Sequence, residues 1–114
     1  MLLYLELRMR NNWHTNQERR VIRRHGGQPL VKSGFDGLIN GKPVEVRSSR
    51  KDKRYRIQKD VHQNLVRKSG SYIFCKNGKT KRVPATKVSE MLSRGKWFKD
   101  RNYPHKFLEV DAVF

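Results

Sequence analysis

The chain has 114 residues, which is enough for one domain with a single modest core. Its 27 lysines and arginines outnumber 10 acidic residues and give a formal net charge of +17, which indicates a polyanionic partner, above all nucleic acid. A membrane surface is disfavoured because no long basic amphipathic helix is evident, and no segment is apolar enough to span a bilayer. The only cysteine, Cys75, excludes an internal disulfide and a cysteine-based zinc site.

The first ten residues are too short and too polar for a signal peptide, because Glu6 interrupts them. We therefore expect a cytoplasmic location, meaning intracellular, nucleoid-associated or in the cytoplasm of a virus-infected host. Apolar and polar residues alternate over 2–10, which predicts a strand. Residues 15–18 have the form of a capping box and predict a helix that runs to about His25 and stops at Gly26-Gly27. A further strand is expected to begin near Leu30.

The dipeptide Asn40-Gly41 lies between two short apolar runs and predicts a tight hairpin. A two-residue loop at this position fixes the register, pairing Ile39 with Lys42, Leu38 with Pro43, Gly37 with Val44, and Asp36 with Glu45. The apolar face of the hairpin, which is the better candidate for the core, carries Phe35, Gly37, Ile39, Val44 and Val46. The other face carries Asp36, Leu38, Pro43, Glu45 and Arg47.

Asp36 and Glu45 would be about 5 Å apart in this register and, if ionised, would repel by about 3 kcal/mol at an effective dielectric near 20. Three compensations are open: the nearby Arg47, a shared proton, or a divalent cation. Oxygen ligands suit Mg²⁺ or Mn²⁺. A metal-free surface ladder of these three side chains is the alternative. Glu18 shares a helical stripe with Val21, Ile22 and His25 that should face the protein, although it could equally complete the capping box with Thr15.

The segment after the hairpin, residues 48–56, is predicted to be a basic connection. Apolar residues then recur every four positions from Ile57, which predicts a helix to about Ser69 that ends at Gly70. Residues 71–76 form a short apolar run typical of a strand, in which Cys75 is expected to be a buried small residue. A second hairpin is expected at Asn77-Gly78, where the sequence Asn-Gly-Lys-Thr lacks the first glycine of a phosphate-binding loop.

A last helix is predicted around Val88, Met91 and Leu92, with Thr86 as its N-cap and Gly95 at its end, followed by a strand from Phe107. The chain thus predicts an α/β class, with a small mixed β-sheet flanked by helices. We expect a single domain over 1–114, with an N-terminal strand at 2–10, a core at 15–75, and a C-terminal helix and strand at 85–114. The histidines at 14, 25, 62 and 105 show no metal-binding spacing.

Glu18, Asp36 and the Glu45-x-Arg47 motif together resemble the PD-(D/E)XK nucleases, and within them the archaeal-type Holliday junction resolvases. The resemblance covers roughly residues 15–75 and includes "NQERRVI", "VKSGFDGLINGKPVEVRSSRKDKRY" and "LVRKSGSYIFC". It implies a restriction-endonuclease-like fold. It also implies Mg²⁺- or Mn²⁺-dependent cleavage of branched DNA by a homodimer.

The resemblance assigns roles residue by residue. Asp36 and Glu45 would bind the metal directly, and Glu18 directly or through water. Arg47 stands where the family has its catalytic lysine, and Ser33 matches a loop serine near the scissile phosphate. Gln58 falls near a position where related nucleases carry a supporting residue, although a solvated helix residue is the alternative.

The basic residues around this motif are expected to contact the phosphates of DNA without reading its sequence. They are Lys32, Arg50, Lys51, Lys53, Arg54 and Arg56, and Tyr55 among them could stack on a base or simply anchor the loop. The first hypothesis is a metal-dependent endonuclease on four-way junctions. The alternatives are a repair or restriction-type nuclease on linear or flapped DNA, and a nuclease-like module that only binds DNA, since arginine cannot serve as a base.

Overall fold

The computed structural model of the protein describes residues 16–31, 34–49, 53–92, 97–99 and 104–114. Several sequence predictions lie outside these residues. They are the strand at 2–10, the capping Thr15, and the positions of His14, Lys32, Ser33, Arg50, Lys51 and Gly95. The described part of the first helix covers residues 16–24, and it turns at Gly26, whose φ of 76° glycine adopts readily. The predicted end of this helix is confirmed.

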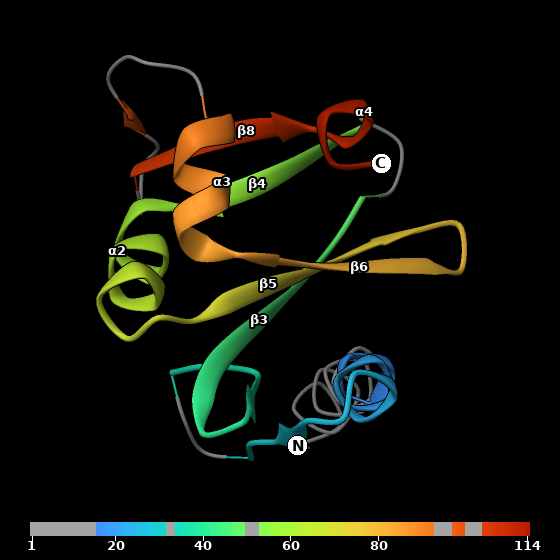
Figure 1. Cartoon of the computed structure of the whole chain (residues 1–114). Coiled ribbons are helices and arrows are strands. Elements are labelled where there is room, and N and C mark those ends of the chain that lie inside the picture. Colours follow the sequence, from blue (N-terminus) through green and yellow to red (C-terminus); the bar gives the residue numbers. More distant parts are fainter. Residues whose placement is uncertain (1–15, 32–33, 50–52, 93–96, 100–103) are drawn as a thin grey trace, which may run out of the picture.

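A mixed sheet of five strands forms the centre of the fold, in the order β1-β2-β3-β5-β6 (Figure 1). The strands are β1 (Gln28–Pro29), β2 (Gly37–Ile39), β3 (Lys42–Ser48), β5 (Ser71–Lys76) and β6 (Lys79–Pro84). β3 and β5 are parallel, whereas the other neighbours are antiparallel. The predicted α/β class with a mixed sheet is confirmed. The strand expected from Leu30 is instead the two-residue β1 just before it.

Both Asn-Gly turns are confirmed. Asn40 and Gly41 have φ of 51° and 76°, and Asn77 and Gly78 have φ of 47° and 80°, the left-handed values that a two-residue hairpin loop requires. The first three predicted pairs are also confirmed, namely Ile39 with Lys42, Leu38 with Pro43, and Gly37 with Val44. The hairpin signal therefore fixes the register of β2 on β3.

A second sheet of three strands packs over the first, in the order β4-β8-β7. Its strands are β4 (Arg54–Gln58), β8 (Pro104–Glu109) and β7 (Phe98–Lys99). The prediction of a basic loop over 48–56 is wrong for β4, in which buried Tyr55 and Ile57 alternate with the exposed Arg54 and Arg56. This period of two is the pattern of a strand with one face in the core.

Three more helices of the described residues alternate with the strands, one each after β4, β6 and β8. The α2 helix (Lys59–Arg67) begins two residues after the predicted start, because Ile57 belongs to β4. The α3 helix (Ala85–Met91) has Pro84 at its N-cap, so the assignment of Thr86 as the cap is wrong, and Thr86 lies within the first turn. The predicted last strand is β8, which begins before Phe107 and is followed by the short α4 (Val110–Val113).

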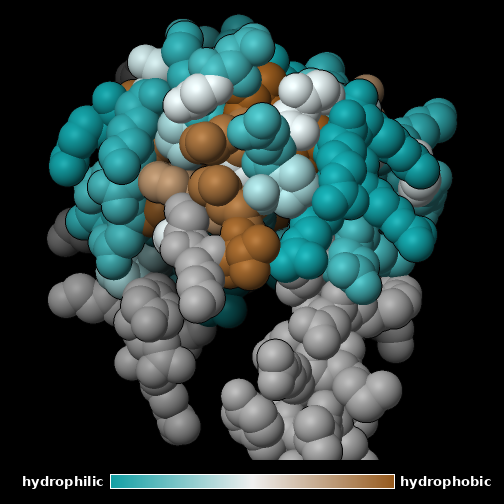
Figure 2. All heavy atoms as spheres, turned by 90° about the horizontal axis from the view of Figure 1, so that it is seen from below, coloured by the Kyte–Doolittle hydropathy of each residue, from teal (hydrophilic) through white to brown (hydrophobic). Residues whose placement is uncertain are grey.

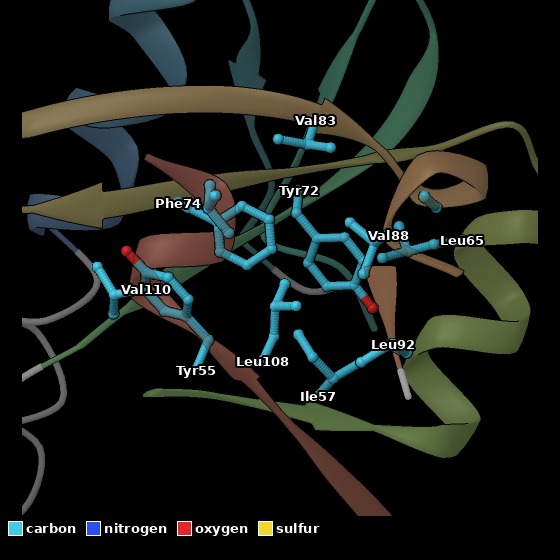
Figure 3. Close-up of a cluster of buried hydrophobic side chains, with 12 residues drawn as sticks. Tyr55, Ile57, Leu65, Tyr72, Phe74, Val83, Val88, Leu92, Leu108 and Val110 are labelled. Carbon is cyan, nitrogen blue, oxygen red and sulfur yellow. The ribbon is translucent and has the colours of Figure 1, made fainter. Parts of the chain in front are cut away.

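The five-stranded sheet is covered on both faces. Ile22 of the first helix packs with Ile39, Val44, Val46 and Ile73 on one face, as the hairpin pattern predicts. The prediction is wrong for Phe35, which lies before β2 and packs against the cluster on the opposite face. On the other face, Tyr72 and Phe74 of β5 pack against the second sheet and the later helices (Figure 3). The molecule therefore has three layers, with the first helix on one side and the second sheet with α2 and α3 on the other (Figure 1).

The outer surface is strongly polar. On the face seen from below in Figure 1, hydrophilic side chains surround a small hydrophobic area (Figure 2). No helix in the described ranges is long and apolar enough to cross a membrane.

Gly70 offers a test of how closely α2 packs on the hairpin. A Cβ atom at this position would lie 2.5 Å from the carbonyl oxygen of Pro43 and 2.7 Å from Cδ2 of Leu65. We expect Gly70→Ala to lower the free energy of unfolding by about 1–3 kcal/mol, because the backbone of β3 must move. Gly34→Ala is the control, since nothing lies within 4 Å of its Cβ position. Urea denaturation of both variants checks this, and equal stabilities would contradict the packing.

Candidate functional site

The predicted site lies at an edge of β3 that β2 leaves uncovered. The pairing of β2 with β3 ends at Gly37 and Val44, although β3 itself continues to Ser48. Alternate residues of a strand direct their N–H groups to the same edge, so the N–H of Val46 points where β2 would have continued. Beyond Val44, the edge of β3 therefore has a backbone N–H, that of Val46, which no strand partner among the described residues satisfies.

Asp36 occupies that edge with its side chain. The chain bends at Asp36, and Oδ2 of this residue accepts a hydrogen bond of 2.8 Å from the N–H of Val46. The expectation that Asp36 and Glu45 form a further backbone pair of the hairpin is therefore wrong. The carboxylate takes the ladder position that the backbone leaves, and it meets Glu45 through side chains.

Glu45 and Arg47 lie on the same face of β3, as predicted. Glu45 is only 5% exposed, and its Oε2 is 3.1 Å from Nη1 of Arg47. The same Nη1 donates a 3.0 Å hydrogen bond to the carbonyl oxygen of Val46. Arg47 is thus held against the strand beside Glu45, and its charge partly compensates that carboxyl.

Glu18 reaches the same edge from the first helix. It is half-buried, with Val21, Ile22 and His25 on the helix face that packs on the protein, which confirms the predicted stripe. Asp36 interacts electrostatically with both Glu18 and Glu45, and Arg47 also acts on both. Three carboxyl groups and one guanidinium therefore meet around β3, although they come from three separate segments.

Burial and the close approach of these carboxyl groups raise the pKa values of Glu18 and Glu45. Burial, and then the negative charge of Asp36, raise the pKa of Glu45 from 4.5 to about 8, against the opposing effect of Arg47. The same causes raise the pKa of Glu18 from 4.5 to about 7. Hydrogen bonds to Asp36 contribute in both cases. Near neutral pH the cluster therefore retains protons that isolated carboxyls would have lost.

The three carboxyl groups are of the chemical type that binds a hard divalent cation. Their oxygens are the ligands that such ions prefer, and when ionised they carry more negative charge than Arg47 offsets. Their present geometry is closed, with Asp36 hydrogen-bonded to the backbone and to the other two carboxyls. Within the described ranges, no group of three or more His, Cys, Asp and Glu side chains is set out to hold a metal ion. Metal binding would thus require Glu18 and Glu45 to lose their protons and separate.

A cavity of about 970 Å³ opens beside the cluster, between the first helix, β3, β4, β8 and the turn that joins β5 to β6. Glu18 and Arg47 line it and connect it to the carboxyls. Its lining is otherwise rich in cationic side chains, which also include Arg20, Arg24, Arg54, Arg56 and Lys79. Such a cavity concentrates positive potential where a polyanion would enter.

The sequence predicts only some of the cationic residues that line this cavity. Arg54 and Arg56 were predicted as phosphate contacts and do line it, whereas Lys53 is exposed but does not line it. Arg20 and Arg24 were missed, although their spacing of four residues on the first helix could have placed both on one face. Lys79 and Phe107 were also missed, because only the tertiary fold brings them to the cavity.

Tyr55 requires a correction. Of its two predicted roles, base stacking is wrong and anchoring is the nearer one, because its side chain is 0% exposed and packs on Phe74, with ring centroids 4.6 Å apart (Figure 3). Its hydroxyl donates a 2.9 Å hydrogen bond to the carbonyl oxygen of Cys75. Tyr55 is therefore a core residue. Cys75, which was expected to be buried, is half-buried, because it packs against the core on one side and lines the cavity on the other.

The remaining polar candidates make contacts elsewhere. Gln58 lies at the N-cap of α2 and is half-buried. The ring of His25 hydrogen-bonds to Thr80 at 2.8 Å. The buried ring of His62 contacts the hydroxyls of Tyr72, at 2.9 Å, and Ser89, at 2.7 Å. These hydrogen bonds assign His25 and His62 a structural role in the fold.

Comparison with known proteins leaves the site to be interpreted from its own geometry. The chain matches no protein-family model, and no curated protein matches it.

Proposed function

We propose that this protein is a metal-dependent DNA endonuclease with a restriction-endonuclease-like fold, related to the PD-(D/E)XK nucleases. The observation that carries the proposal is the meeting of Glu18, Asp36, Glu45 and Arg47 beside a cavity lined by arginines. The order of helix, hairpin, helix and parallel strand also supports it. For an enzyme with this function we also propose a cytoplasmic location, where DNA is present.

The residues of the chain would divide the work of cleavage. The cationic lining would hold the phosphate backbone, which supplies affinity without sequence preference. Arg47, fixed by Glu45 and the Val46 carbonyl, would orient the scissile phosphate and offset charge that develops on it. Glu18, Asp36 and Glu45 would hold Mg²⁺ or Mn²⁺. The bound ion would polarise a phosphoryl oxygen and acidify a water molecule.

The substrate class we propose is branched DNA, with the four-way Holliday junction as the first candidate and a homodimer as the acting species. A protein that binds phosphates through a basic cavity selects the shape of DNA more readily than its sequence. A dimer would place two such cavities on the opposed strands of a junction.

Cleavage of a panel of DNA structures tests this function. The protein is incubated with four-way junction, flapped, nicked and linear duplex DNA of the same sequence, in Mg²⁺ or Mn²⁺ and in EDTA. We expect metal-dependent cleavage that is fastest on the junction. Faster cleavage of flapped or linear DNA would indicate a repair or restriction-type nuclease, whereas tight binding without cleavage of any substrate would contradict the enzyme.

A DNA-binding module without activity is the second candidate, and one observation favours it. Arg47 lies 3.1 Å from Glu45 and compensates the charge that a cation would otherwise neutralise. This candidate predicts DNA binding with a steep dependence on salt concentration and no effect of Glu45 substitution on that binding.

Substitution of Arg47 separates these two candidates. We expect Arg47→Lys to reduce the rate of junction cleavage by up to about tenfold, since lysine keeps the charge but not the forked geometry. Arg47→Met, which removes the charge, should reduce the rate by about 100-fold. Single-turnover cleavage measures both, with DNA affinity measured in parallel. A normal rate for Arg47→Met would contradict the role of Arg47, and a large gain for Arg47→Lys would mean that the natural site is attenuated.

A further inference from the structure

Phe107 lies on the surface of the second sheet at a position where a polar residue would be expected. It is 38% exposed, while its neighbour Leu108 is 3% exposed and belongs to the core. The alternation of β8 therefore directs Phe107 away from the core, and its side chain lines the basic cavity. An exposed aromatic ring beside cationic side chains offers a flat surface on which a ligand ring can stack.

Arg54 and His105 hold the ring of Phe107 in place. The guanidinium carbon of Arg54 lies 4.5 Å from the ring centroid, over its face. The His105 ring meets Phe107 nearly edge-on, with centroids 5.0 Å apart and an interplanar angle of 77°. Arg54 and Phe107 come from neighbouring strands, so the antiparallel ladder of β4 and β8 fixes their relative position. The result is a stacked cation and aromatic ring that exists before any ligand arrives.

The side chains that line the cavity indicate which class of ligand it would bind. Arginines and Lys79 along the wall suit phosphate groups, and the Arg54–Phe107 pair suits a flat aromatic ring. A nucleotide carries both groups, and stacking on aromatic or guanidinium planes is the usual way that proteins hold exposed bases. A base within a duplex is already stacked on both sides, so only an unpaired nucleotide can use this pair.

We propose that the Arg54–Phe107 pair is a stacking site for an unpaired base, next to the phosphates bound in the same cavity. This inference deepens the proposed function and rests on it, because it names the feature of branched DNA that the protein selects. A flap carries unpaired nucleotides from its first position, and a four-way junction exposes them where base pairs at its branch point open. The site would therefore give such DNA an advantage over continuous duplex.

Binding measured without divalent cations tests the stacking site independently of cleavage. The probes are a flapped DNA with 2-aminopurine at its first unpaired position and a duplex of the same sequence, both in EDTA. With the wild-type protein we expect quenching of the flap fluorescence and tighter binding of the flap. Phe107→Leu should weaken flap binding by about tenfold and remove the quenching, with duplex affinity within about twofold of wild type.

Two further variants keep this test decisive. Phe107→Trp should retain quenching and affinity, because it preserves the aromatic surface. Phe114→Leu is the matched control, since Phe114 is similarly exposed, at 41%, but does not line the cavity; it should bind both probes like the wild type. Thermal melts establish that each variant is folded, and if Phe107→Leu does not fold, Phe107→Met, which also removes the ring, takes its place with the same expected result.

Several results would overturn the stacking site. One is an equal loss of flap and duplex binding in Phe107→Leu, and another is equal behaviour of the Phe107 and Phe114 variants. Normal quenching in Phe107→Leu would do the same. These results leave the proposed nuclease in place, because cleavage is measured separately with Mg²⁺. Failure of the wild type to bind either DNA would overturn both.

Discussion

Glu45→Gln is expected to reduce the rate of DNA cleavage by at least about 100-fold while leaving DNA affinity nearly unchanged. Glutamine has the size of the buried glutamate, so the packing of β3 persists, but it supplies no negative charge to a cation. Glu45 does not line the basic cavity, so its loss should not alter the contacts proposed to bind phosphates. Single-turnover cleavage and equilibrium binding of the same junction measure the two effects.

Glu90→Gln is the matched control for this substitution. Glu90 is exposed, pairs with Lys87 at 3.3 Å within α3, and lies outside the cavity. We expect it to cleave like the wild type. Cleavage by Glu45→Gln at the wild-type rate would remove Glu45 from the catalytic set, and an equal loss in both variants would assign the effect to general damage.

The second large effect expected is on the pH dependence of stability. Below pH 4.5, Glu18 and Glu45 are protonated in both the folded and the unfolded chain, so their raised pKa values have no effect. Between pH 4.5 and about 8 the unfolded chain releases these protons while the folded chain retains them. The free energy of unfolding should therefore fall as pH rises through this window, and level off above it.

Glu45→Gln should remove most of the pH dependence that Glu45 contributes. Because glutamine never ionises, the variant should be more stable than the wild type at pH 8 without metal, and similar at pH 4. Melting temperatures across this range, measured in EDTA, check the prediction. A variant that is less stable than the wild type at pH 8 would show that the ion pair with Arg47 outweighs the crowding of carboxyls.

Divalent metal should act on the same groups in the opposite direction. Mn²⁺ competes with the protons of Glu18 and Glu45, so it should raise the melting temperature at pH 8 and have little effect at pH 5. At a concentration 100 times the dissociation constant, one site adds about 2.7 kcal/mol to the free energy of unfolding. Glu45→Gln should lose this response. Equal stabilisation of the variant would place the ion elsewhere.

The parts of the fold that depend on neighbouring residues could be predicted from the sequence. The left-handed backbone at Asn40-Gly41 fixes three cross-strand pairs within a few residues, and the same holds for the turn at Asn77-Gly78. The stripe with Glu18 depends only on the helical period. These local rules were enough to identify Glu18, Asp36, Glu45 and Arg47 as candidates for one site.

The second sheet could not be predicted, because its pairing joins residues that are far apart in the chain. Arg54 pairs with Glu109, and Gln58 with His105, and nothing near β4 in sequence indicates those partners. The dense positive charge of the segment made it resemble a solvated loop, although its alternation is that of a strand. This is why Tyr55 was assigned to the surface and Phe107 was overlooked.

In the site, too, the features set by neighbouring residues could be predicted, and those set by tertiary packing could not. Register predicted that Asp36 and Glu45 come together, but not that Asp36 would leave the ladder and bond to the N–H of Val46. The chain must bend away before this position, and the sequence gives no sign of where it does so. The cavity arginines come from the first helix and from β4, so only the tertiary packing places them around Glu18.

The most direct test of the proposed metal site is a crystal structure of the protein soaked in Mn²⁺ at pH 8, with anomalous scattering measured for manganese. We expect an anomalous peak at about 2.0–2.3 Å from carboxylate oxygens of Asp36 and Glu45, with Glu18 bound directly or through a water molecule. Glu45 should then have turned from Arg47 towards the ion. A structure without manganese at these carboxyls, in which Glu45 still pairs with Arg47, would contradict a metal-dependent nuclease site.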